Sequence, residues 1–136
     1  MDRSGKAGVL PQDGATVATG KLGGTSVLIA EDEMFIASDI AIAVRDADGT
    51  VIGPFATLEE VRMAIEATMP AAAILDVNLL DGDIDAVLPA LRVGGTRIVI
   101  NTGSGRPDEL AERYPDLPVF IKPTDPNELV AELSRG

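Results

Sequence analysis

The chain has 136 residues, of which 46% are hydrophobic and only 3% aromatic, so it can form one domain with a core of Ala, Val, Ile and Leu. It has no cysteine and no histidine, which excludes a disulfide framework, thiolate or imidazole metal sites, a serine–histidine triad and a phosphohistidine on this chain. A net charge of −11 disfavours nucleic-acid partners, and because no long apolar run or signal segment is present, we expect a cytoplasmic protein without a membrane partner.

The chain begins with a segment that we predict to be a flexible N-terminal tail, residues 1–24. This segment is rich in Gly, Ala and Thr and shows no sustained hydrophobic period. It therefore cannot bury enough apolar surface to offset the entropy cost of ordering. The folded domain is predicted to span residues 25–136.

Alternating strands and helices follow the tail. An apolar run at 25–30 predicts a strand, and apolar residues at helical spacing predict a helix at 34–46. A second strand is predicted at 50–55, where Pro54 either ends the strand or places it at an edge of the sheet. A capping box opens the next helix, which is predicted at 57–68.

The second half of the chain continues the alternation. Residues 71–75 form an apolar run that ends at Asp76 and predicts a buried strand. A helix is predicted over 84–93, where Pro89 indicates a kink or a late start. The remaining predicted elements are strands at 97–101 and 118–121 and helices at 107–114 and 125–136.

This order of elements indicates an α/β fold. Strict alternation predicts a doubly wound five-stranded parallel sheet with right-handed crossovers and helices on both faces. The carboxyl ends of all the strands then lie at one edge of the sheet, where ligands bind in such folds. We therefore expect the residues that follow the strands to share a site.

The residues that follow the predicted strands are mostly charged or polar. They are Glu31 and Asp32, Asp76 and Asn78, Thr102, and Lys122. Taken one at a time, each is more typical of a helix cap, a turn or a solvated surface. Together, three acids would repel one another unless a divalent cation held them, and all-oxygen ligation suits Mg²⁺. The lysine and the threonine would then bind a phosphoryl group.

Four short motifs resemble, in order and spacing, the receiver domain of two-component response regulators. They are Val27-Leu28-Ile29-Ala30-Glu31-Asp32-Glu33, Ile74-Leu75-Asp76, Thr102-Gly103 and Ile121-Lys122-Pro123. The resemblance covers roughly residues 25–135, nearly everything but the tail. It implies the flavodoxin-like strand order 2-1-3-4-5 that is known from the chemotaxis regulator. It also implies a cis peptide bond between Lys122 and Pro123.

The resemblance implies a mechanism, in which a sensor histidine kinase or a histidine phosphotransfer protein phosphorylates an aspartate with the help of Mg²⁺. The matching residues are Asp76 for the phosphoacceptor, Glu31, Asp32, Asp76 and the backbone carbonyl of Asn78 for the metal ligands, Thr102 for the hydroxyl that follows the phosphoryl group, and Lys122 for the lysine that pairs with it. Such a protein is a signalling phosphoacceptor rather than an enzyme, although it can catalyse its own phosphorylation and dephosphorylation. We expect a stand-alone regulator that is read by a downstream protein.

Within the family, the chain is similar to the single-domain receivers called the Fat Guy group, of whose Phe-Ala-Thr-Gly motif only Thr102 and Gly103 are present. The expected switch residues are Thr102, Gly103, Ser104 and Val119. Ser104 stands where that group often has an aromatic residue, and Val119 stands where many receivers have one on the fifth strand. How phosphorylation would be transmitted is therefore open.

Two other functions are compatible with the sequence. A pseudo-receiver would keep the fold but signal without phosphorylation, and the missing aromatic residues favour it while the complete acidic site argues against it. A small phosphohydrolase would use the same site on a free substrate. That class is characterised by an Asp-x-Asp motif, whereas the chain has Asp76-Val77-Asn78.

Overall fold

The computed structural model describes residues 20–135. The predicted tail, apart from its last five residues, lies outside this range. Within the described part of the chain, no helix is long and apolar enough to cross a membrane.

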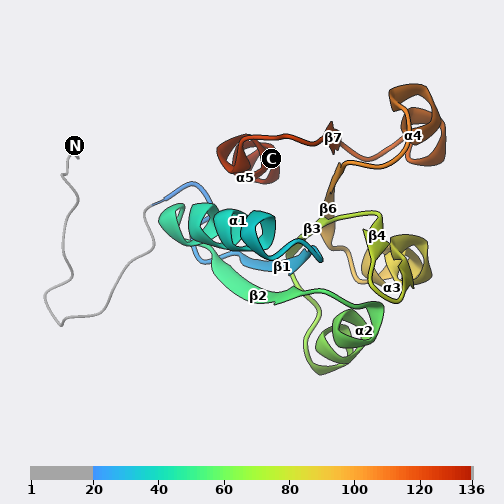
Figure 1. Ribbon diagram of the computed structural model, residues 1–136. Helices are drawn as coiled ribbons and strands as arrows, with labels where there is room; N and C mark the ends of the chain where they lie inside the picture. The colour runs from blue at the N-terminus through green and yellow to red at the C-terminus, as the bar shows by residue number, and fades with distance from the viewer. Residues whose placement is uncertain (1–19, 136) are drawn as a thin grey trace, which may run out of the picture.

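A five-stranded parallel sheet forms the centre of the domain, with helices on both faces (Figure 1). Its strands are β1 (Ser26–Ala30), β2 (Thr50–Phe55), β3 (Ala72–Leu75), β6 (Arg97–Thr102) and β7 (Val119–Ile121). They lie in the order β2-β1-β3-β6-β7, and each neighbouring pair is parallel. Counted among these five alone, the order is 2-1-3-4-5, which confirms the predicted flavodoxin-like fold. Pro54 lies in β2, which is an edge strand.

Two hydrophobic layers hold the helices to the sheet. On one face, α1 (Met34–Asp46) and α5 (Pro126–Ser134) pack beside each other (Figure 1). On the other face lie α2 (Leu58–Ala67), α3 (Leu88–Val93) and α4 (Pro107–Arg113). Alternate residues of each central strand belong to alternate layers, so that Leu28 packs in one layer and Ile29 in the other. Both faces of the sheet are buried, which explains why the central strands are continuous apolar runs.

The segment after β3 differs from the prediction of one short helix over 84–93. It forms a short hairpin of β4 (Asn78–Leu79) and β5 (Gly82–Asp83), then a 3₁₀ turn, η1 (Ile84–Ala86), and only then α3. Pro89 stands in the first turn of α3, where a missing backbone N–H costs nothing. Of the two alternatives predicted from Pro89, a kinked helix or a helix that starts late, the late start is therefore correct. The hairpin was not predicted, because strands of two residues show no period.

Residues 20–24, which we predicted to be part of the tail, pack against the domain. The side chain of Leu22 is buried in the layer under α1. Its backbone N–H donates to the carbonyl of Ala47 at 2.9 Å, and the N–H of Gly24 donates to the carbonyl of Asp48 at 2.7 Å. The packed part of the chain therefore begins before the predicted boundary at residue 25. A single apolar residue among glycines carries no periodic signal from which this could be predicted.

Replacing Leu22 with alanine should destabilise the domain, because the leucine fills the core beneath α1. We expect the free energy of unfolding to fall by about 2–4 kcal/mol, as for other buried leucines. Urea denaturation would measure the change. Leu80→Ala is the matched control, since the side chain of Leu80 is 70% exposed. Equal stability of the two variants would contradict the packing of this segment.

Candidate functional site

The backbone places the predicted site residues at one edge of the sheet. The hydrogen-bond ladder continues one residue past the strands: the N–H of Glu31 donates to Phe55 at 2.9 Å, and that of Asp76 donates to Ala30 at 2.8 Å. On the far side, the N–H of Lys122 donates to the carbonyl of Thr102 at 3.0 Å. These side chains are therefore positioned by the rigid sheet rather than by loops.

Three carboxylates meet at this edge. Glu31, Asp32 and Asp76 each offer an oxygen atom, and these atoms lie within 4.8 Å of one another. Glu31 and Asp76 are only 4% and 7% exposed, whereas Asp32 is half-buried. Mg²⁺ prefers hard oxygen ligands and needs few of them from the protein, so the donor set fits this ion. The three predicted acidic ligands are thus brought together.

Lys122 supplies the positive charge of the site. Its Nζ lies 2.7 Å from Oε1 of Glu31 and 2.8 Å from Oδ2 of Asp76, and its side chain is only 10% exposed. It also lies 3.3 Å from Oε2 of Glu33, which sequence reasoning did not select. The run of three acids at 31–33 was the sequence signal that could have identified Glu33. Burial would lower the pKa of Lys122, but the hydrogen bonds to Asp76 and Glu31 outweigh it and raise that pKa above its usual range, so the lysine stays charged.

Glu31 is a buried acid whose pKa departs from its ordinary value. Burial raises the pKa of Glu31 from 4.5 to about 7, although hydrogen bonds from Lys122 and from the backbone N–H of Glu33 oppose the shift. The negative charge of Asp76 adds to the increase. Ionising Glu31 therefore works against folding, which indicates that the cluster is arranged for binding rather than for stability.

A polar bridge connects the loops that follow β6 and β3. Thr102 is completely buried, and its Oγ1 lies 3.1 Å from Oγ of Ser104. Nδ2 of Asn78 donates to the same Ser104 oxygen at 2.6 Å. The backbone N–H of Asn78 in turn points to Oδ1 of Asp76 at 3.4 Å. The structure thus joins two of the predicted switch residues to a predicted metal ligand.

The other two predicted switch residues, Gly103 and Val119, contribute no side-chain hydrogen bond to this bridge. A Cβ atom added to Gly103 would lie 3.6 Å from Cδ of Lys122, an ordinary contact, so lack of space does not require glycine there. Val119 is half-buried and lines a groove of about 290 Å³ between α4 and β7, together with Leu110, Tyr114 and Ile121. The neighbouring aromatic residue of β7, Phe120, packs in the other layer, on the face of α1 and α5.

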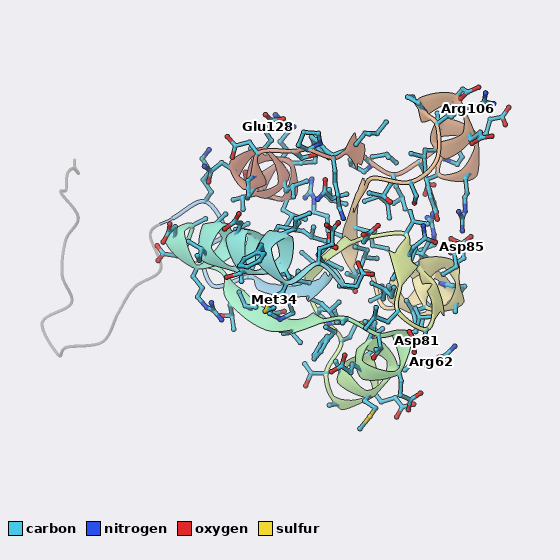
Figure 2. All side chains as sticks on the ribbon, in the orientation of Figure 1. Met34, Arg62, Asp81, Asp85, Arg106 and Glu128 are labelled. Atoms are coloured by element: carbon cyan, nitrogen blue, oxygen red, sulfur yellow. The ribbon has the colours of Figure 1, made fainter. Side chains whose placement is uncertain are left out.

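Two ion pairs and a hydrogen bond hold the end of α4, and they were not predicted from the sequence. Arg113 donates to Asp83 at 2.5 Å and to Asp85 at 2.6 Å, and the hydroxyl of Tyr114 donates to Asp85 at 2.8 Å. Asp85 lies on the side of η1 that faces α4 (Figure 2). These contacts join the helix after the Thr102 loop to the segment after Asp76.

Comparison with known proteins finds relatives both in sequence and in structure. No protein-family model matches the chain. The phyllosphere-induced regulator PhyR of Methylorubrum extorquens is 31% identical over 115 residues, which are 82% of this chain but 43% of PhyR. The structure of the response regulator PhyR from Brucella abortus is 30% identical with a TM-score of 0.70, and covers 82% of this chain and 46% of that one. The chain therefore spans less than half of the length of these relatives.

Other solved structures support the same fold. PhyR from Bartonella quintana, described as an anti-anti-sigma factor, is 28% identical with a TM-score of 0.67 over 82% of this chain and 46% of its own. A CheY-like response regulator receiver domain protein from Methanospirillum hungatei is 19% identical with a TM-score of 0.70 over 81% of this chain and 90% of its own. At that identity the last similarity concerns the fold alone.

Glu31→Gln should stabilise the protein in EDTA at pH 8. Because the pKa of Glu31 is about 7 in the folded protein, above its ordinary 4.5, the folded state holds the proton more tightly. Its ionisation therefore costs stability: the cost is absent below about pH 4.5, grows between pH 4.5 and about 7, and is constant above that. Neutral glutamine removes this cost, so we expect a gain of roughly 1–3 kcal/mol at pH 8, after allowance for the weaker contact with Lys122, and little change near pH 4.

Urea denaturation at the two pH values would measure this gain. Glu33→Gln is the matched control, because Glu33 also contacts Lys122 but its side chain is 63% exposed. A Glu31→Gln protein that is less stable than the unmodified chain at pH 8 would contradict the effect of burial.

Proposed function

Because this chain is a response-regulator receiver domain, we propose that it signals by accepting a phosphoryl group on Asp76 in the presence of Mg²⁺. The donor would be the phosphohistidine of a sensor histidine kinase or of a phosphotransfer protein. One observation carries the proposal: a buried lysine ammonium lies between the carboxylates of Glu31 and Asp76, with a third acid beside them at the carboxyl edge of the sheet.

Phosphoryl transfer needs little covalent chemistry from the protein. An oxygen of the Asp76 carboxylate attacks phosphorus, the bond from phosphorus to the donor imidazole nitrogen breaks, and its electron pair leaves with the imidazole. Asp76 becomes an acyl phosphate. Its backbone N–H is held by β1, so the nucleophile is oriented before the donor arrives.

The surrounding residues would stabilise the charge on the transferring group. Glu31, Asp32, Asp76 and the backbone carbonyl of Asn78 would hold Mg²⁺, which when bound neutralises part of the negative charge on the phosphoryl oxygens. Lys122 is already within 2.8 Å of the attacking carboxylate and would pair with a phosphoryl oxygen. The hydroxyl of Thr102 would donate a further hydrogen bond.

Phosphorylation would be transmitted through the loop after β6. A phosphoryl group that attracts the Thr102 hydroxyl would compete with its contact to Ser104, and so with the bridge to Asn78. The loop leads into α4, and α4 and β7 present the groove that contains Val119. We propose this face as the contact surface for a downstream protein. Since one relative is described as an anti-anti-sigma factor, a component of sigma-factor regulation is the first candidate to test.

Treatment with acetyl phosphate and Mg²⁺ should add one phosphoryl mass to the protein, and Asp76→Asn should abolish the addition, because the amide is not a nucleophile here. Intact mass spectrometry would measure it. Asp39→Asn, on the exposed side of α1, is the matched control and should be phosphorylated normally. Absence of an adduct both with acetyl phosphate and with a cognate kinase would reject the phosphoacceptor.

A pseudo-receiver is the second candidate, favoured by the absence of an aromatic side chain at Val119 and Ser104. Titration with Mg²⁺ separates the two, since the three carboxylates of a working receiver should bind it and raise the temperature of thermal unfolding. Asp76→Ala should weaken that response by roughly tenfold in Mg²⁺ concentration, because it removes a direct ligand. An unmodified chain that does not respond to Mg²⁺ would favour the pseudo-receiver.

A further inference from the structure

Asn101 is a buried polar residue that the proposed mechanism does not use. It stands in β6 directly before Thr102 and is only 3% exposed. Its side-chain oxygen Oδ1 has no hydrogen-bond donor among residues 20–135. A buried acceptor without a partner costs free energy, and the neighbouring residues of β6 show that an apolar side chain would fit the strand pattern. The presence of an amide here therefore needs an explanation.

The register of the sheet places Asn101 beside Asp76. Leu75 pairs with Ile100, so the next residues along the two strands, Asp76 and Asn101, are neighbours. Residues alternate between the two faces, and Val99 belongs to the layer under α1 and α5. Asn101 lies on this same face, as do Glu31 and Asp76, which follow Ile29 and Ile74 at a spacing of two.

The side chain of Lys122 has to cross β6 on that face. Lys122 follows β7, whereas its two carboxylate partners follow β1 and β3, and β6 lies between β3 and β7. Its methylene groups lie near Gly103, where an added Cβ would be 3.6 Å from the lysine Cδ. Gly103 and Asn101 are two residues apart. The lysine therefore runs across the carboxyl end of β6, on the face that carries Asn101.

We propose, on the basis of the function proposed above, that Asn101 is a positioning residue that accepts a hydrogen bond from the Lys122 ammonium when a divalent cation binds the carboxylates. In the structure, the ammonium contacts carboxylate oxygens of Glu31, Glu33 and Asp76. A cation bound to Glu31 and Asp76 takes these oxygens and repels the ammonium. Oδ1 of Asn101 is the unpartnered acceptor beside the path along which Lys122 retracts.

In this second position, Lys122 would still be able to bind a phosphoryl group. A displaced lysine without an acceptor would be driven into solvent, away from the phosphoryl group. With Oδ1 of Asn101 as acceptor, the ammonium stays in the site and next to Asp76, while two of its N–H groups are free for phosphoryl oxygens. The unpartnered oxygen of Asn101 therefore costs free energy before the cation binds, and its hydrogen bond to Lys122 is favourable afterwards.

Asn101→Leu tests the inference, because leucine has nearly the same size but no acceptor. The dissociation constant for Mg²⁺ alone, measured by calorimetry, should rise about 5- to 10-fold. The temperature of unfolding in EDTA should stay the same or rise, since the unpartnered oxygen is gone. Asn101→Thr, which keeps a hydroxyl acceptor, should lose less affinity. A merely structural role would instead lower the unfolding temperature of both variants, and that result would overturn the proposal.

A double-mutant cycle identifies the partner of Asn101. In a Lys122→Met background, Asn101→Leu should change the Mg²⁺ affinity by less than about twofold, because the group that it positions is absent. An equal loss with and without the lysine, or no loss in the single variant, would overturn the inference. Mg²⁺ is the probe, so failure of phosphorylation would reject the proposed function and leave this result standing. An unmodified chain that does not bind Mg²⁺ would reject the role of Asn101 itself.

Discussion

The ammonium of Lys122 holds together an edge of the sheet that electrostatics would otherwise force apart. Its side chain starts beyond β7 and reaches carboxylates that follow β3 and β1, so a single cation spans four strands. Without it, the oxygens of Glu31, Asp32 and Asp76 would lie within 4.8 Å of one another with no compensating charge. Under our proposal, a divalent cation would compete with Lys122 for these carboxylates, and the site would then have two arrangements.

This proposed competition would also explain why the site is not optimised for stability. Burial raises the pKa of Glu31 to about 7 despite the contact with Lys122, and Oδ1 of Asn101 is left without a donor in residues 20–135. A stability-optimised sheet would have apolar residues at both positions. Groups that cost free energy at the end of well-packed strands are characteristic of binding sites, and here both lie next to Asp76.

The fold and the central site were accessible from the sequence because their signals are periodic or positional. Apolar runs fixed the strands, and the residue after each run identified Glu31, Asp76, Thr102 and Lys122. Features without a period were missed: Leu22 is a single apolar residue among glycines, and the β4–β5 hairpin has two residues per strand. The unpartnered oxygen of Asn101 could not be predicted either, because hydrogen-bond partners of a side chain depend on residues from other strands.

Signal output would use the contacts that lead from the site to α4. The bridge from Thr102 through Ser104 to Asn78, and the contact of Arg113 and Tyr114 with Asp85, are the physical links from the site to α4. Under the proposed function, both would respond to phosphorylation of Asp76. Borohydride reduction of the protein after treatment with a phosphodonor converts an aspartyl phosphate to homoserine, which peptide mass spectrometry can locate. The account predicts homoserine at position 76 alone; homoserine at another acidic residue, or at none, would contradict it.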